Sequence, residues 1–154
     1  MIYKSIFSSA LGFVEICADG TQAITRAYFT STPSAEYTEN EITRRACEQL
    51  EEYFAGSRRC FDVPLAPEGS DFQKQVWDLC KTIPYGESRT FKELAAMLGD
   101  TGAARKIGAA VEENPICIFI PAHRVTGKMS FLAALSSNNA VQEALLGAEQ
   151  AFLR

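Results

Sequence analysis

The chain has 154 residues, of which 47% are hydrophobic and 22% are charged, and its formal net charge at pH 7 is −4. This length suits one domain or two small ones, and no apolar run approaches the roughly 18 residues of a membrane span. We therefore expect a protein without a membrane segment or signal peptide, located in the cytoplasm or, in a eukaryotic cell, in the nucleus.

The charge is unevenly distributed along the chain. Residues 1–69 hold six basic and ten acidic residues, whereas residues 70–130 hold eight basic and seven acidic ones. The net acidity argues against a large basic surface for nucleic acid. Any DNA binding is thus expected in the second half of the chain, and it should be modest and sensitive to salt.

The cysteines and the single histidine predict no metal site and no cofactor. The five cysteines are scattered, none forms a C-x-x-C pair, and one histidine cannot complete a zinc cluster with them. We expect reduced and mostly buried thiols at Cys17, Cys47, Cys60, Cys80 and Cys117.

The N-terminal third predicts a small antiparallel sheet followed by one helix. Apolar segments at residues 2–7, 11–17 and 23–29 indicate strands, with a turn signal at Asp19-Gly20. Apolar positions then recur at helical spacing from Thr38 to Ala55, and Gly56 ends the helix. Thr38 and Glu41 are candidates for its capping box.

A segment containing Pro64, Pro67 and Gly69 indicates a linker, so we predict two domains, residues 1–66 and 67–154. The second begins with a helix capped by Ser70. Two further helices, Thr90–Leu98 and Ala103 to about Glu112, are joined by a glycine-containing turn and predict a helix-turn-helix, whose second helix would be the recognition helix. A last helix lies within residues 136–154, with Leu145 and Phe152 on its apolar side.

A central stretch from Asn114 to Val125 holds the unusual chemistry. Its apolar run predicts a short buried strand that ends at Pro121, where the backbone must turn and present His123 and Arg124. Such a turn is where enzymes place a nucleophile beside a base. The neighbour of the histidine is Ala122, which has no nucleophile.

This stretch resembles the active-site signature of the alkylguanine-DNA alkyltransferases, also called methylated-DNA–protein-cysteine methyltransferases. The resemblance rests on Asn114-Pro115 and on Pro121-Ala122-His123-Arg124-Val125, and it extends to Gln49–Gly56, Phe61, Pro64-Leu65, Phe72-Gln73 and Val76-Trp77. The family has a cysteine at the position of Ala122, where it accepts the alkyl group of 6-O-alkylguanine. A subset, the alkyltransferase-like proteins, lacks this cysteine and binds the lesions without removing them.

The resemblance implies an α/β (α+β) fold, with a small sheet-and-helix domain followed by a winged helix-turn-helix domain, and a monomer that binds double-stranded DNA containing alkylated guanine. It also implies roles for residues near the turn. His123 would be the general base, Glu149 would orient it, and Asn114 would tie the turn together. Without a thiol to activate, His123 and Glu149 are expected to persist as a hydrogen-bonded pair.

The resemblance also implies a set of residues that contact DNA or the flipped base. Arg105 would fill the gap in the base stack, Lys106 would meet phosphate, and Gly108 would allow close approach to phosphate or tight helix packing. The remaining members are Phe91, which stands where tyrosine is usual, Arg124, the pocket residue Val125, Leu135 in place of a wall tyrosine, and Ser136, which could donate to a guanine oxygen.

Three functional hypotheses follow. The first is a reader of damaged bases that flips 6-O-alkylguanine without transfer and marks it for other repair proteins. The second is an alkyltransferase inactivated by a cysteine-to-alanine substitution at position 122, or one that uses Cys117, which burial should keep inert. The third is a degenerate relative that no longer binds DNA. Departures at Phe91, Leu135, Ser137 and Asn138 favour natural divergence over a single engineered change, and Glu112 and Glu113 lower the expected affinity.

Overall fold

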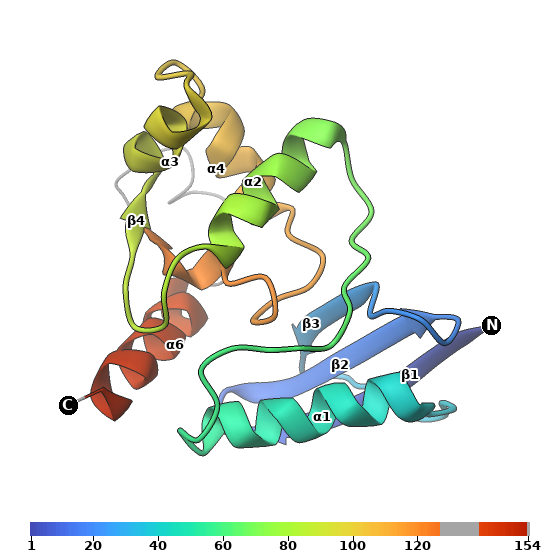
Figure 1. The fold of residues 1–154 in the computed structure, drawn as a ribbon. Helices are drawn as coiled ribbons and strands as arrows, with labels where there is room; N and C mark the ends of the chain where they lie inside the picture. The colour runs from blue at the N-terminus through green and yellow to red at the C-terminus, as the bar shows by residue number, and fades with distance from the viewer. Residues whose placement is uncertain (127–138, 154) are drawn as a thin grey trace. The chain divides into compact units, whose positions relative to one another are not determined.

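The computed structural model describes residues 1–126 and 139–153 and confirms the mixed α/β fold (Figure 1). The chain forms two compact units. The first comprises Met1–Glu68 and Pro115–Phe119, and the second comprises Gly69–Asn114 and Ile120–Arg154. The sequence analysis divided the chain at a single point, so it did not predict that residues 115–119 return to the first unit. No helix within the described ranges has both the length and the apolar character needed to cross a membrane.

The first unit contains the predicted antiparallel sheet. Its strands are β1 (Ile2–Ser9), β2 (Gly12–Asp19) and β3 (Arg26–Thr30), paired in the order β1-β2-β3. Ile16 at the centre of β2 lies opposite Ser5 on β1 and Ala27 on β3. Since side chains alternate along a strand, Ile16 shares one face of the sheet with Val14, and both are fully buried.

Helix α1 (Glu41–Phe54) packs on this face of the sheet, where Phe54 stacks on Phe7 of β1 with 5.5 Å between ring centres. The helix begins at Asn40, whose side chain accepts a 3.0 Å hydrogen bond from Thr43 N, while Thr43 Oγ1 accepts one from Asn40 N. The predicted capping box of Thr38 and Glu41 is therefore wrong. Thr38 lies before the helix, and its carbonyl accepts a hydrogen bond from Lys4 N of β1.

The opposite face of the sheet holds a buried carboxylate. Glu15 is 2% exposed and accepts hydrogen bonds from Lys4 Nζ at 3.2 Å, from Ser34 N at 2.8 Å and from the hydroxyl of Tyr28. Burial alone would raise the pKa of Glu15, but these donors lower it to about 2, and burial together with the bond to Glu15 raises the pKa of Tyr28 to about 12. The hydrogen bond from Ser34 N to Glu15 anchors the segment after β3 to the sheet.

We predict that Glu15→Gln lowers the free energy of unfolding by about 2 kcal/mol at pH 7, because a hydrogen-bonded charged group is lost. The folded-state pKa lies below the ordinary value of 4.5, so this stability is present above pH 4.5 and is lost as the pH falls towards 2. Urea unfolding at several pH values checks this. The difference in free energy of unfolding between Glu15→Gln and the unmutated protein should shrink as the pH falls from 4.5 towards 2. As a control, Glu36→Gln at an exposed position should change the free energy of unfolding little. A difference that does not depend on pH would contradict a lowered pKa for Glu15.

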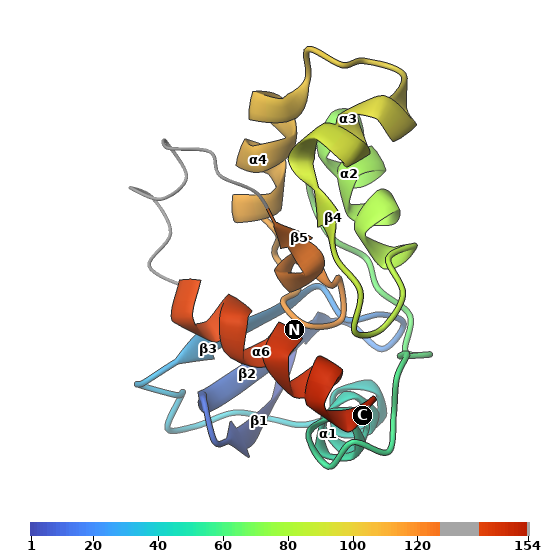
Figure 2. The ribbon, with the colours of Figure 1, turned by 90° about the vertical axis from the view of Figure 1, so that its left-hand side faces the viewer.

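The second unit is built from helices and one short sheet. It contains α2 (Asp71–Lys81), β4 (Arg89–Thr90), α3 (Phe91–Leu98), α4 (Ala104–Glu112), the 3-10 turn η1 (Ala122–Arg124), β5 (Val125–Thr126) and α6 (Asn139–Phe152). Figure 2 shows β5 beside β4, with which it pairs in parallel. Within the described residues this two-stranded sheet is the only one in the unit, so the predicted wing stays a prediction.

The helix-turn-helix prediction matches α3 and α4. Ser70 caps α2 and Thr90 caps α3, each through a capping box with the residue three positions later. Gly99 ends α3 in the left-handed conformation at φ +78°, which glycine adopts without strain. Trp77 of α2 donates from Nε1 to Ala110 O of α4 at 2.8 Å, so α4 rests on α2.

Two expectations were wrong. Ile116 and residues 118–120 are buried, but the run forms no strand, because Ile118 has φ +69° and only single bridges occur there, with Ala27 of β3 accepting from Cys117 N. In α6, Leu145 is buried but Phe152 is 47% exposed, and the side chain that enters the interior is Glu149, at 1% exposed. Hydrophobic periodicity cannot anticipate a buried carboxylate.

Candidate functional site

The turn that carries Ala122 is held by backbone and amide hydrogen bonds. Ala122 N donates to Ile120 O at 2.7 Å, and Arg124 N donates to Pro121 O at 3.0 Å. Asn114 Nδ2 donates to Ile120 O at 3.0 Å, which is the kind of contact that its expected role in tying the turn requires. The side chain of Ala122 is partly exposed, while the two residues that follow it are buried.

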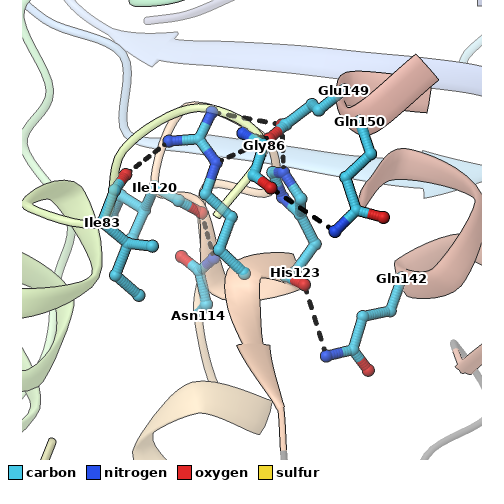
Figure 3. A network of polar contacts seen from close by, with 9 residues as sticks. Ile83, Gly86, Asn114, Ile120, His123, Gln142, Glu149 and Gln150 are labelled. Carbon is cyan, nitrogen blue, oxygen red and sulfur yellow. Dashed lines mark hydrogen bonds and ion pairs between the residues drawn. The ribbon is translucent and has the colours of Figure 1, made fainter. Parts of the chain in front are cut away.

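Glu149 of α6 is the centre of the network beneath this turn (Figure 3). Its Oε1 accepts from Arg124 Nε at 2.9 Å and from Gly86 N at 2.8 Å. Its Oε2 accepts from Arg124 Nη2 at 3.1 Å and lies 2.6 Å from His123 Nε2. The expected His123–Glu149 pair is thus present, and the carboxylate also fastens the arginine of the turn and the loop before β4.

These contacts determine the protonation of His123. The other three contacts of Glu149 come from N–H groups, two of them on the guanidinium of Arg124, so the carboxylate is ionised and His123 Nε2 must carry the hydrogen. Burial lowers the pKa of His123, although Glu149 opposes the shift. The ring is therefore neutral near pH 7, and its Nδ1 is a buried acceptor with no hydrogen-bond partner among the described residues.

Arg124 is a structural residue in this arrangement. It is 6% exposed, its Nη1 donates to Ile83 O at 2.8 Å, and its guanidinium lies 5.6 Å from the ring centre of Tyr85. The guanidinium is engaged within the protein in this way, and the predicted DNA contact of Arg124 stays a prediction that these contacts do not support. The sequence places it beside His123 but does not show that Glu149 lies within reach of both.

Two residues that the sequence analysis missed complete the support of the turn. Gln142 of α6 donates from Nε2 to Val125 O at 2.5 Å, in the first full turn of the helix. Gly86 has φ +79°, and a Cβ there would lie 2.2 Å from Leu153 Cδ1. Pro84 and Gly86 are residue types that signal a turn, but nothing in the sequence signals a backbone N–H that donates to Glu149.

The predicted DNA-facing residues of α4 fall into two groups. Arg105 and Lys106 are exposed, whereas Gly108 is buried beside Ile107, which favours tight helix packing over contact with phosphate. Lys106 and Glu113 border a shallow pocket of about 480 Å³ between α4 and the start of α2. Glu113 accepts a hydrogen bond from Gln73 Nε2 across this pocket.

The other predicted site residues lie in the interior or outside the described residues. Phe91 is 7% exposed and Val125 is fully buried, so both belong to the core of the second unit here. Leu135 and Ser136, with the departures Ser137 and Asn138, lie outside the described residues, and the structure does not place them.

No cysteine with a shifted pKa suits an acceptor. Cys117 belongs to the first unit, and burial raises its pKa to about 12. Burial likewise raises the pKa of Cys80 to about 12 and that of Cys47 to about 11. In the part of the chain that the structure describes, no group of three or more histidine, cysteine or acidic side chains could hold a metal ion.

Comparisons with known proteins agree with this architecture. The family described as 6-O-methylguanine DNA methyltransferase, ribonuclease-like domain, matches residues 2–67, and its DNA binding domain matches residues 71–151. A methylated-DNA–protein-cysteine methyltransferase of Methanosarcina acetivorans is 40% identical, over 96% of this chain and 98% of its own. The constitutive methylated-DNA–protein-cysteine methyltransferase of Bacillus subtilis is 36% identical, over 95% of this chain and 93% of its own.

Solved structures show the same fold. The crystal structure of Mycobacterium tuberculosis O6-methylguanine methyltransferase is 34% identical and superposes with a TM-score of 0.85, over 98% of this chain and 94% of that one. The structure of the same organism's protein in complex with DNA has a TM-score of 0.83 and 35% identity, over 97% of this chain and 94% of that one. The chain therefore belongs to the 6-O-methylguanine DNA methyltransferase family and carries its ribonuclease-like and DNA-binding domains in that order.

Proposed function

We propose that this protein binds 6-O-alkylguanine in double-stranded DNA by flipping the base, and that it does not transfer the alkyl group. The observation that carries the proposal is Ala122, a methyl side chain at the acceptor position of a turn whose other supports, Asn114, His123 and Glu149, keep their contacts. Family membership and the relative in complex with DNA support the choice of DNA as partner.

The absence of transfer follows from the chemistry of the acceptor. Transfer needs a thiolate whose sulfur attacks the alkyl carbon while the carbon–oxygen bond to guanine breaks. Alanine supplies no such group, and Cys117, with its pKa raised to about 12, stays protonated near pH 7. A neutral His123 at this turn has no thiol to deprotonate.

The proposed cellular role follows from binding without repair. A monomer in the compartment that holds the DNA, the cytoplasm or a nucleus, would mark the lesion for other repair proteins. The alternative is an alkyltransferase inactivated at position 122, and the intact His123–Glu149 pair at 2.6 Å is the observation that favours it. The damage reader and the inactivated alkyltransferase differ in whether binding of the damaged base at the site around Ala122 is itself the function.

We predict tighter binding to a duplex with one 6-O-methylguanine than to the same duplex with guanine, and no transfer. Fluorescence titrations of both duplexes measure the preference, and incubation with DNA labelled on the methyl group measures transfer. Label on any cysteine would contradict the absence of transfer. Equal affinity for both duplexes would contradict the reader function and would favour the hypothesis of a degenerate family member.

We further predict that Arg105→Ala weakens binding to the damaged duplex more than binding to the undamaged one. A flipped base leaves a gap, and unstacking costs a few kcal/mol that a planar cation in the stack can offset. Lys106, about 100° around the helix, is expected to meet phosphate and is the matched control. Lys106→Ala should weaken both duplexes about equally, and equal losses for Arg105→Ala would show that no base is flipped around it.

A further inference from the structure

An unusual backbone conformation lies four positions before Ala122. Ile118 has φ +69°, and it is the only residue other than glycine with a positive φ among those that the structure describes. Phe119 N donates to Cys117 O at 2.7 Å, which closes a three-residue turn around Ile118. With φ near +70° this is the rare and strained form of the γ-turn, and a β-branched side chain makes the conformation costlier still.

Packing within the first unit offsets the strain at Ile118. Its side chain is 2% exposed, and residues 115–119 belong to this unit. The same segment is fastened to β3, since Ala27 N donates to Pro115 O and Ala27 O accepts from Cys117 N, each at 2.9 Å. Strained backbone conformations persist only where the surrounding structure holds them, and they concentrate at functional sites.

The strained turn leads directly into the turn that carries Ala122. Ile120 follows Ile118 by two positions, and its carbonyl accepts from Ala122 N at 2.7 Å and from Asn114 Nδ2 at 3.0 Å. Pro121, with φ −79° and ψ 61°, gives this second turn the common, relaxed γ form. The dihedral angles at Ile118 therefore set the direction in which the chain enters the turn, and a change of φ from positive to negative would redirect it.

We propose that Ile118 is a positioning residue for this turn: burial of its side chain holds a backbone conformation that places Ala122 and His123 for the flipped base. The part that concerns the flipped base rests on the proposed function. The placement of the turn does not, because it is a property of the free protein. The two parts of Ile118 have separable roles, since the side chain supplies the packing and the backbone supplies the direction.

Glycine and alanine at position 118 separate these roles. Both remove the buried side chain, but glycine adopts a positive φ without strain, whereas alanine keeps the strain and loses the packing that offset it. Ile118→Gly is therefore expected to retain the turn, and Ile118→Ala is expected to leave it. In urea unfolding, the equilibrium constant for unfolding of Ile118→Gly should be about three- to tenfold smaller than that of Ile118→Ala.

Ile116 is the matched control for these variants. It is fully buried in the same segment, and its φ is not positive. At such a position glycine is less favourable than alanine, so the equilibrium constant for unfolding of Ile116→Gly should be about two- to fivefold larger than that of Ile116→Ala. Alanine as the more stable residue at both positions would overturn the strain at Ile118 and the inference with it.

The single histidine reports the turn in the free protein. In histidine-labelled protein, the ring resonances of His123 are expected to shift or double in Ile118→Ala and to match the unmutated protein in Ile118→Gly and in both Ile116 variants. If Ile118→Ala does not fold, Ile118→Val takes its place, because it keeps the strain and loses one methyl group of packing. Unchanged resonances in the variant used overturn the positioning role.

Binding to DNA measures the consequence for the proposed function. The ratio of affinities for duplexes with 6-O-methylguanine and with guanine does not depend on the fraction of folded protein, so a merely structural role would not move it. The ratio should stay within about twofold of the unmutated value in Ile118→Gly and fall at least about threefold in Ile118→Ala. Equal ratios in both variants overturn the role in lesion binding. A ratio of one for the unmutated protein overturns the proposed function, and the histidine spectra then still decide whether Ile118 positions the turn.

Discussion

Ala122→Cys is expected to convert the protein into a stoichiometric acceptor that takes one methyl group from 6-O-methylguanine in DNA. The pieces that a thiol needs are in place in the second unit. His123 follows position 122 directly and is neutral, its Nδ1 is an acceptor without a partner among the described residues, and Glu149 lies 2.6 Å from Nε2 to stabilise the imidazolium that forms when the thiol loses its proton. The unmutated protein should take up no label, so the expected effect is a gain from none to one equivalent.

Matched variants separate this gain from side reactions. Ala122→Ser introduces a hydroxyl, which is a far weaker nucleophile than a thiol at this pH, and should remain unlabelled. Cys117→Ala in the Ala122→Cys background should keep the full label and so place it on residue 122. If the cysteine variant binds the damaged duplex but takes up no label, then the departures at Phe91 and Leu135 have removed something that transfer requires.

Glu149→Ala is expected to lower the free energy of unfolding of the second unit by about 3–5 kcal/mol, or the Tm by roughly 10 °C. The substitution removes the acceptor of four contacts at once. It leaves the buried guanidinium of Arg124 without its carboxylate, and uncompensated buried charge is among the most destabilising changes known. Thermal and urea unfolding measure the effect.

The same helix offers a control for this variant. Glu143 of α6 is exposed, so Glu143→Ala should change the free energy of unfolding by less than about 0.5 kcal/mol. Glu149→Gln keeps the shape but places an amide N–H₂ group against N–H donors, and it should lie between alanine and the unmutated protein. A loss below about 1 kcal/mol for Glu149→Ala would mean that the network does not hold the turn.

The helices were predicted well from the sequence because the features that start and orient a helix depend on residues close together in the chain. The spacing of apolar residues and the capping residues Ser70 and Thr90 identify α2 and α3, since both depend on neighbours within one or two turns. Competition between nearby capping residues decided the start of α1, where Asn40 displaced Thr38. The family signature around Pro121 then placed the site in the second half of the chain.

What the sequence could not supply depends on residues brought together by folding. Arg124 follows His123 in the chain, yet its role is set by Glu149, 25 positions later, and by the carbonyl of Ile83. Gly86 contributes only a backbone N–H, which leaves no trace in side-chain chemistry. The run at 116–120 has strand-like composition, but a left-handed residue at Ile118 breaks it. Composition does not report backbone dihedral angles.

The path of residues 115–119 has a consequence for synthesis on the ribosome. These residues complete the first unit, where Ala27 N donates to Pro115 O and Phe119 lies 4.5 Å from Phe61, ring centre to ring centre. The sheet and α1 are translated long before this segment emerges, so the N-terminal unit stays unfinished until most of the chain has been made. A fragment that ends near residue 68 would lack residues 115–119, which complete its core. A fragment that begins near residue 69 would carry the apolar side chains of Ile116, Ile118 and Phe119, which are buried in the whole chain, without the first unit that buries them. The two units are therefore expected to mature together rather than one after the other, and separate expression of either half should favour aggregation.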